Sequence, residues 1–182
     1  MTTLNRSGKA LLVIDVQVGV VAEAFKREET LAAINVAIGK ARAAGIPVIW
    51  VQHSDEELVL ESAEWQIAPE LEPLAGEHKI RKLYPSSFEA TELEAVLSEL
   101  SVGHVYICGA ETNNCVRHTS HSAIERGYDV TLISDAHTTT GFEWGGYVVD
   151  AARVIDEQNI NFLQKDLPGR TVVAVPSAKL EF

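Results

Sequence analysis

The chain has 182 residues but only two cysteines, Cys108 and Cys115, and only 15 lysine and arginine residues against 26 aspartate and glutamate residues. Two cysteines cannot build the disulfide framework of a small secreted domain. A formal net charge of −11 repels nucleic-acid phosphates and anionic lipids. We therefore expect neither a nucleic acid nor a membrane as a partner.

Long hydrophobic runs are also missing. No segment approaches the roughly 18 apolar residues of a membrane helix, and residues 1–9 lack the apolar stretch of a secretory signal. Together with unpaired thiols, this predicts a soluble, cytoplasmic protein. A hydrophobic fraction of 46% at this length fits one globular domain, so we expect a single domain spanning residues 1–182.

Short apolar runs alternate with helical patterns along the chain. The apolar runs predict strands at residues 10–14, 48–51, 105–108, 130–133 and 171–175. Spacings of three and four predict helices around residues 31–41, 93–100, 116–124 and 148–157, the first three ending at Gly45, Gly103 and Gly127. Strands that are apolar throughout must be covered on both faces. The sequence therefore predicts a three-layer α/β/α domain with a mainly parallel central sheet.

Residues 53–81 interrupt this alternation. The segment is polar, contains Pro69 and Pro73, and is too long for a plain connection. We expect it to shape the mouth of a site, because ligands of open parallel sheets bind beyond the carboxyl ends of the strands. Asp15 and His53 follow two of the predicted strands at that edge.

Cys115 is the best candidate nucleophile. It follows a polar turn after the strand at 105–108 and precedes a helical pattern. A thiol at a helix start faces the positive end of the helix dipole, which favours the thiolate, and nearby backbone N–H groups could receive an oxyanion. The alternative is a small buried residue that packs helix against strand. Cys108 lies within the apolar strand, and we expect it only to pack.

Two charged residues could assist a thiol, but the residues alone leave their roles open. Asp15 is either a carboxylate that caps a loop or a partly desolvated general base at a strand end. Lys82 lies in a basic cluster at residues 78–82. It belongs either to a solvated patch or to the site, as one lysine turned inward.

Metal and cofactor motifs are not evident. His118 and His121 lie three residues apart without a further ligand at suitable spacing, and His53 with Asp55 lacks a third partner. The sequence contains no serine nucleophile elbow and no phosphate-binding glycine loop. We expect no metal and no cofactor. Residues 141–146 suggest a flexible lid, in which Trp144 could cover a pocket.

Three segments in order, at residues 11–17, 82–88 and 109–116, resemble the isochorismatase-like cysteine hydrolases, a group that includes nicotinamidases and N-carbamoylsarcosine amidase. The resemblance extends over residues 9–175. It implies a catalytic triad of Asp15, Lys82 and Cys115 and an oxyanion hole formed by the backbone N–H groups of Glu111 and Cys115. In this family a cis peptide precedes the residue at the Glu111 position.

The resemblance implies a hydrolase that cleaves a C–N bond of a small-molecule amide, ureide or carbamoyl compound through a thioester. The alternatives are isochorismate-type vinyl-ether hydrolysis and a non-catalytic protein that binds a small ligand. Nicotinamidases carry an Asp-x-His metal pair where this chain has His53-Ser54-Asp55, so their metal site is not expected.

We place four residues around the substrate pocket: Gln17, His53, Tyr84 and Trp144. The resemblance further implies a homo-oligomer. Trp65, Ile67 and the Trp144 region would supply apolar surface for it.

Overall fold

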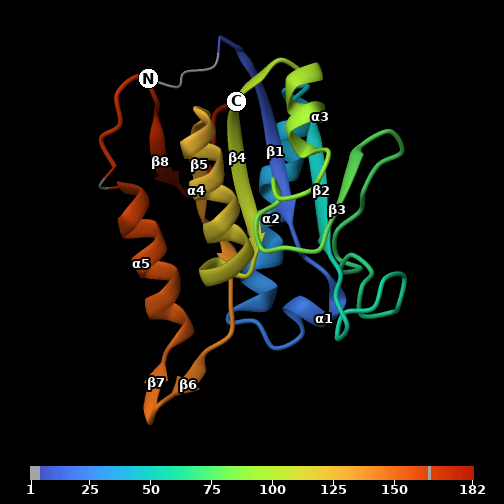
Figure 1. The fold of residues 1–182 in the computed structure, drawn as a ribbon, viewed down its shortest axis with the longest axis vertical. Coiled ribbons are helices and arrows are strands. Elements are labelled where there is room, and N and C mark those ends of the chain that lie inside the picture. Colours follow the sequence, from blue (N-terminus) through green and yellow to red (C-terminus); the bar gives the residue numbers. More distant parts are fainter. Residues whose placement is uncertain (1–4, 164) are drawn as a thin grey trace.

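The computed structural model describes residues 5–163 and 165–182 of the chain. Its centre is a six-stranded sheet in the order β3-β2-β1-β4-β5-β8, and each adjacent pair of strands is parallel (Figure 1). The strands are β1 (Gly8–Ile14), β2 (Val48–His53), β3 (His78–Lys82), β4 (Val102–Ala110), β5 (Asp129–Thr138) and β8 (Val172–Val175). The predicted parallel sheet is confirmed.

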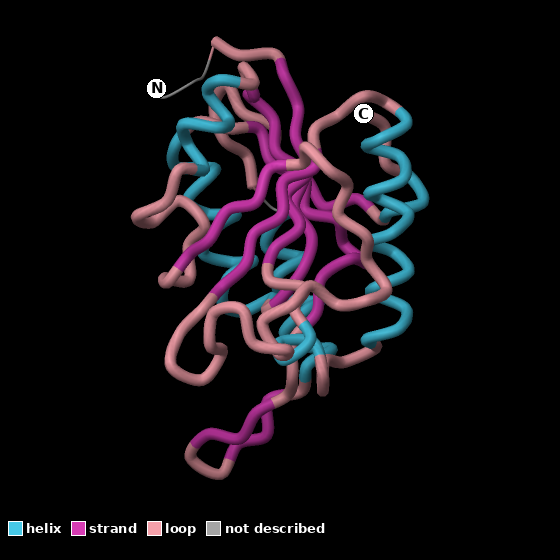
Figure 2. Tube along the Cα trace, turned by 90° about the vertical axis from the view of Figure 1, so that its right-hand side faces the viewer, coloured by secondary structure: helices cyan, strands magenta, loops and turns pink. Residues whose placement is uncertain are grey.

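Helices cover both sides of this sheet (Figure 2). One side carries α1 (Val18–Val21) and α2 (Arg27–Ala43), and the other carries α3 (Leu93–Glu99), α4 (Arg117–Arg126) and α5 (Ala151–Leu163). The chain thus forms the predicted three layers. Short helical turns at Thr112–Val116 and Ser177–Lys179 complete the structure.

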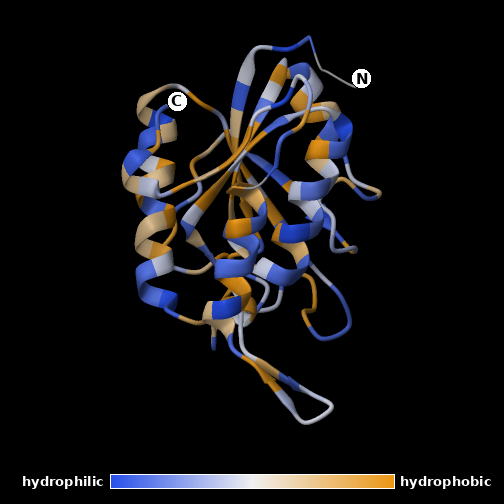
Figure 3. Cartoon of the chain, turned by 90° about the vertical axis from the view of Figure 1, so that its left-hand side faces the viewer, coloured by the Kyte–Doolittle hydropathy of each residue, from blue (hydrophilic) through white to orange (hydrophobic). Residues whose placement is uncertain are grey.

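The side chains of β1 alternate between the two faces of the sheet, which explains why helices must cover both faces. Leu12 and Ile14 pack into the apolar cluster shared with α3, α4 and α5, whereas Leu11 and Val13 pack into the cluster shared with α2. Successive side chains of a strand point to opposite faces, so a strand that is apolar throughout supplies two cores at once. Figure 3 shows these strands as a hydrophobic centre between helices whose outer faces are hydrophilic.

The helix ends differ in part from the sequence-based expectation. Helices α2 and α4 end just before Gly45 and Gly127, as predicted. Gly103 does not end α3 but lies inside β4, where an added Cβ would come within 2.0 Å of the Arg6 carbonyl oxygen. Position 103 therefore requires a glycine, because another backbone segment passes close to it.

Helix α5 was expected to begin near Val148, and this is wrong. Residues 142–149 form a two-stranded hairpin of β6 (Phe142–Trp144) and β7 (Tyr147–Val149), which projects away from the body of the domain (Figure 2). The helix begins after Asp150, whose Oδ1 accepts a hydrogen bond from the Ala152 N–H at 2.7 Å. This carboxylate caps the helix and fixes its start.

The polar segment that begins at residue 53 leads into a strand that was not predicted from the sequence. β3 pairs with β2 at the sheet edge, with Ile80 and Lys82 buried and Lys79 and Arg81 exposed. Residues 54–77 form an irregular loop, tied to the end of β1 by a bridge between Gln17 and Ile67. Across residues 5–163 and 165–182, the structure holds no helix that is both long and apolar enough to span a membrane.

Candidate active site

Three side chains meet where β1, β3 and β4 end. Lys82 Nζ lies 2.6 Å from Asp15 Oδ2 and 3.2 Å from Cys115 Sγ. All three residues are buried, with 1%, 2% and 7% of the Asp15, Lys82 and Cys115 surfaces exposed. The three residues that the family resemblance implied as a triad therefore do lie together.

Asp15 is held in an unusual backbone conformation directly after β1. Its φ is +49°, a region that non-glycine residues rarely occupy and that is often found at functional sites. Its N–H donates to the Val51 carbonyl at 2.9 Å. Next to it, Gly109 has a φ of +122°, and an added Cβ would lie 2.0 Å from the Ile14 carbonyl oxygen. A glycine at 109 therefore lets the ends of β1 and β4 approach closely.

Lys82 reaches the site because it is the last residue of the edge strand β3. The alternation of that strand turns Lys82 inward while its neighbour Arg81 faces solvent. The Ser54 N–H donates to the Lys82 carbonyl at 3.1 Å, which ties the strand end to β2. Of the two interpretations that the sequence left open, the inward-facing lysine is correct.

Cys115 lies in a single turn of π-helix, Thr112–Val116, that joins β4 to α4. The Val116 N–H donates to the Glu111 carbonyl five residues earlier, at 3.1 Å. The cysteine was expected to open an α-helix, and the structure places it in the π turn that directly precedes that helix. Such π turns occur frequently at functional sites. The peptide bond between Ala110 and Glu111 is cis.

A buried histidine supports this turn. Thr112 Oγ1 lies 2.9 Å from His137 Nδ1, and His137 Nε2 lies 3.0 Å from Asn159 Oδ1. Asn159 Nδ2 donates to the Ser134 carbonyl, so its oxygen faces the histidine. The histidine proton therefore sits on Nε2, and Nδ1 accepts from Thr112. Burial lowers the pKa of His137 to about 4, which keeps the ring neutral.

His137 was not among the site residues predicted from the sequence. Neither its partners nor its burial could be inferred, because Thr112 and Asn159 approach it from elements far apart in the chain. The signal that the sequence did offer is its place at the carboxyl end of β5, beside the other site residues.

The electrostatic environment keeps the sulfur protonated at rest. Burial, with a contribution from the Asp15 carboxylate, raises the pKa of Cys115 to about 12, and Lys82 opposes this rise. Burial likewise raises the pKa of Asp15 against the opposing effect of Lys82. The expected resting thiolate is therefore not what this environment favours. The thiol needs a base as it reacts.

Cys108 behaves as predicted for a packing residue. It is fully buried within β4, and its Sγ lies 3.5 Å from the Leu12 carbonyl. Burial raises the pKa of this thiol. The two cysteines are thus separated into one that faces a cavity and one that fills the core.

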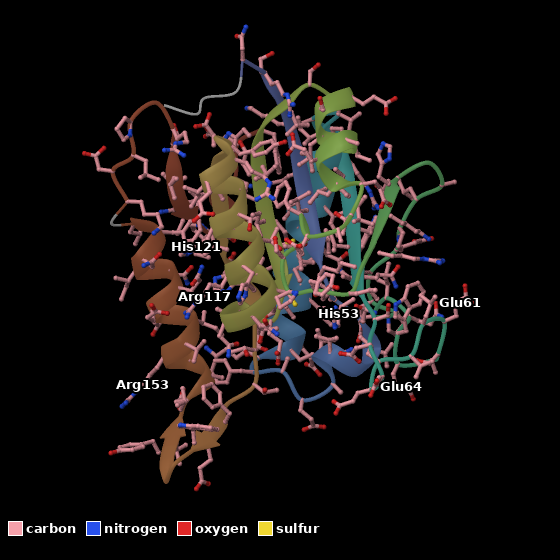
Figure 4. All side chains as sticks on the ribbon, in the orientation of Figure 1. His53, Glu61, Glu64, Arg117, His121 and Arg153 are labelled. Carbon is pink, nitrogen blue, oxygen red and sulfur yellow. The ribbon has the colours of Figure 1, made fainter. Side chains whose placement is uncertain are left out.

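A cavity of about 700 Å³ opens beside Asp15 and Cys115. Its walls come from the segment after β1, the end of β2 with the loop at 54–77, and the residues that follow β3, β4 and β5. Figure 4 labels two of the lining residues, His53 and Glu64. The lining residues are Asp15, Gly19, Val20, Glu23, His53, Asp55, Glu57, Leu58, Glu64, Leu83, Pro85, Glu111, Asn114, Cys115 and Thr140. The polar segment that follows β2 therefore does shape the mouth of the site.

Of the four residues placed around the pocket, His53 lines the cavity and Gln17, Tyr84 and Trp144 do not. Gln17 is fully buried. Its amide bonds the backbone of His53 and the Trp65 carbonyl, so it supports the wall from behind. Tyr84 is 51% exposed, and Trp144 is 79% exposed on the projecting hairpin. The expectation that Trp144 covers the pocket is wrong for a single chain.

The described residues do not bring three His, Cys, Asp or Glu side chains together in a group that could hold a metal ion. His53 instead pairs with Asp55, with 3.0 Å between Nε2 and Oδ2. His118 and His121 are not part of the cavity lining. The site is thus a thiol, a lysine and a carboxylate on the floor of a cavity.

Comparison with known proteins agrees with this geometry. The family model described as "Isochorismatase domain" matches residues 9–153. A streptothricin hydrolase from Streptomyces noursei is 32% identical over 137 residues, covering 72% of this chain and 50% of the relative. An N-carbamoylsarcosine amidase from an Arthrobacter species is 32% identical over 81 residues, which is 44% of this chain and 31% of the relative. The chain thus spans about half the length of the first of these relatives.

The solved structures agree over a larger part of the chain. The crystal structure of an isochorismatase from Pseudomonas putida KT2440 superposes with a TM-score of 0.84 at 27% identity, covering 95% of this chain and 90% of that one. The family model, the relatives and the fold thus agree with the resemblance based on three short segments. This chain belongs to the isochorismatase family.

Proposed function

We propose that this protein is a cysteine hydrolase that cleaves a C–N bond in a small amide, ureide or carbamoyl compound. The observation that carries the proposal is the position of Lys82 Nζ, within 3.2 Å of the Cys115 sulfur and 2.6 Å of the Asp15 carboxylate. Acyl transfer to a thiol requires a nucleophile, a base and a charged group that couples the two.

The chemistry follows from the protonation states. Cys115 begins as a thiol and Asp15 as a carboxylate paired with Lys82. As the sulfur attacks the substrate carbonyl, the S–C bond forms and the thiol proton passes to Asp15. Asp15 then gives this proton to the leaving nitrogen, and the C–N bond breaks to leave a thioester. Water, deprotonated by Asp15, cleaves the thioester and restores the thiol.

The negative charge on the carbonyl oxygen needs donors near Cys115. We assign this role to the backbone N–H groups of Glu111, which directly precedes the π turn, and of Cys115, which lies within it. Donors fixed by the backbone require no reorganisation when the charge develops, which is why they lower the barrier. The network of Thr112, His137 and Asn159 holds this turn in place.

The relatives narrow the compounds to be tested. By their names, two of them act on streptothricin and on N-carbamoylsarcosine. The cavity of about 700 Å³ is in the size range of small-molecule sites. A panel of small amides, ureides and carbamoyl compounds that includes these two is the natural starting point.

Cys115→Ser tests the proposal. The variant should lose at least about 1000-fold in turnover, because a hydroxyl proton is far harder to remove than that of a thiol. With the native protein, mass spectrometry of rapidly quenched reactions should find the acyl group on the peptide that contains Cys115. Turnover by Cys115→Ser close to the native rate would overturn the proposal.

Cys108→Ser is the matched control, since it makes the same chemical change in the core strand. It should keep normal turnover, and its free energy of unfolding should fall by about 1–3 kcal/mol where the new hydroxyl finds no partner. Loss of turnover in both variants with intact folding would point to a general effect of serine in this region.

A further inference from the structure

The wall of the catalytic cavity carries carboxylates from three separate segments. Besides Asp15, these are Glu23, Asp55, Glu57, Glu64 and Glu111. Among the described residues that line the cavity, none is a lysine or an arginine. The acidic character therefore belongs to the cavity and not to one helix or loop, and Figure 4 shows Glu64 on the same side of the molecule as His53.

Most of this negative charge has no paired counter-charge among the described residues. Lys82 balances Asp15, and His53 lies against Asp55. Glu23, Glu57 and Glu64 are exposed at the mouth, and none of them forms an ion pair within residues 5–163 and 165–182. A concave site lined by one sign of charge concentrates ligands of the opposite sign.

The floor of the cavity supplies an independent observation. Asp15 is 1% exposed and lines the cavity, and no group among the described residues donates a hydrogen bond to its Oδ1. A buried acceptor without a donor costs free energy. An acceptor on the floor is therefore open to a donor on a molecule that enters, while the exposed carboxylates stand at the rim.

We infer that the substrate carries a positively charged amine or guanidine group in addition to the C–N bond that is cleaved. The cation lies among Glu23, Glu57 and Glu64 at the mouth while the carbonyl carbon reaches Cys115. This inference rests on the proposed function, because it names the substrate class of the same site. The same field disfavours substrates that carry a carboxylate.

Charged thiol reagents test this without knowledge of the substrate. Cys115 is labelled with trimethylammonioethyl, methyl and sulfonatoethyl methanethiosulfonate, and each rate is divided by the rate of that reagent with a small free thiol. The Cys115→Ser variant identifies labelling at other positions. The corrected rate for the cation should exceed that for the anion by about tenfold or more at low salt, and the ratio should fall as salt is added.

Removal of single rim charges localises the effect. Glu57→Gln and Glu64→Gln should each lower the corrected cation-to-anion ratio by about two- to fivefold. Glu99→Gln removes the same charge from an exposed position at the end of α3, outside the cavity lining, and should leave the ratio unchanged. Equal corrected labelling rates for the two charged reagents would overturn the inference. A cation-to-anion ratio that neither rim substitution changes would also overturn it.

Matched amides separate this inference from the proposed function. The probes are 6-aminohexanamide, hexanamide and the monoamide of adipic acid, which differ only at the distal end of the chain. Hydrolysis that requires Cys115 without preference for the amine would overturn the inference and leave the proposed function standing. Cation-selective labelling without hydrolysis of any probe or of the wider panel would support the cavity's preference for cations and count against the proposed function.

Discussion

Lys82 and Asp15 form an ion pair that is almost completely removed from solvent, with side chains 0% and 1% exposed. Such a pair is a poor source of stability, because desolvation of the two charges offsets their attraction. Removal of one partner is more harmful than removal of both, since it leaves a buried charge uncompensated. The pair is therefore best explained by the chemistry of the neighbouring thiol.

This reasoning predicts different effects for one and for two substitutions. Lys82→Met should lower the free energy of unfolding by about 3–5 kcal/mol at neutral pH. It should also reduce activity at least about 100-fold, because the pKa of Asp15 rises further when Lys82 no longer opposes the effect of burial. Asp15→Asn combined with Lys82→Met should regain most of the lost stability and remain inactive. Urea unfolding and turnover of the amide panel measure both quantities.

Lys79→Met provides the control on the same strand, since Lys79 is exposed and is the second residue of β3. It should alter neither stability nor turnover by a measurable amount. A Lys82→Met variant that is as stable as the double variant would contradict the prediction, because it would show that loss of Lys82 does not leave a costly uncompensated charge on Asp15.

Among the elements, the strands whose residues are continuously apolar could be predicted from sequence because burial on both faces demands that composition. β3 could not, since an edge strand needs apolar residues on one face only, and Ile80 is the sole apolar residue of its five. The period-two alternation of Lys79, Ile80, Arg81 and Lys82 was the available signal. It would have indicated which lysine turns inward.

The cavity wall was harder to predict than the three residues on its floor. Asp15 and Cys115 follow regular elements, and their positions could be inferred from where strands end. Glu23 and Glu64 lie in loops whose course depends on contacts such as those of Gln17 with His53 and Trp65. The periodicity of apolar residues carries no information on the course of a loop. For the same reason, Trp144 was wrongly expected to cover the pocket.

His137 links three elements, since it lies at the end of β5 and contacts the π turn and α5 through Thr112 and Asn159. Its pKa is lowered by burial to about 4, against about 6.5 in an unfolded chain. The folded state therefore binds fewer protons than the unfolded state between these values, with Asp135 the one charge that opposes the shift. The contribution of neutral His137 to stability is therefore fully present above pH 6.5 and is lost as the pH falls towards 4.

The loss attributable to His137 should reach about 3 kcal/mol by pH 4. His137→Gln keeps an acceptor and a donor but cannot be protonated, so its unfolding free energy should fall less between pH 6.5 and 4.5. The measured quantity is the difference between native protein and variant in urea unfolding at each pH. This difference removes the contributions of His104 and His121, whose pKa values burial also lowers. A difference that does not change with pH would show that His137 is not the titrating group.

At the scale of the whole molecule, the β6–β7 hairpin is the part that the domain leaves without cover. Its Trp144, Tyr147 and Val148 are 79%, 76% and 80% exposed, and its strands are three residues long. A hairpin of this kind is barely stable by itself in water. Trp65 was expected to add to an exposed apolar surface, but it is 7% exposed and packs within the chain.

We predict that the hairpin packs against a second copy of the chain, so that the protein is a homo-oligomer. Burial of its aromatic side chains would supply the contacts that a single chain does not give it. Sedimentation velocity at micromolar concentration should show an assembly larger than the monomer. Trp144→Ser combined with Tyr147→Ser should shift it to the monomer, whereas Leu74→Ser, at a position that is 48% exposed in the loop at 54–77, should not. A native chain that sediments as a monomer under these conditions would contradict the prediction, and the hairpin would then have to be stable while fully exposed to solvent.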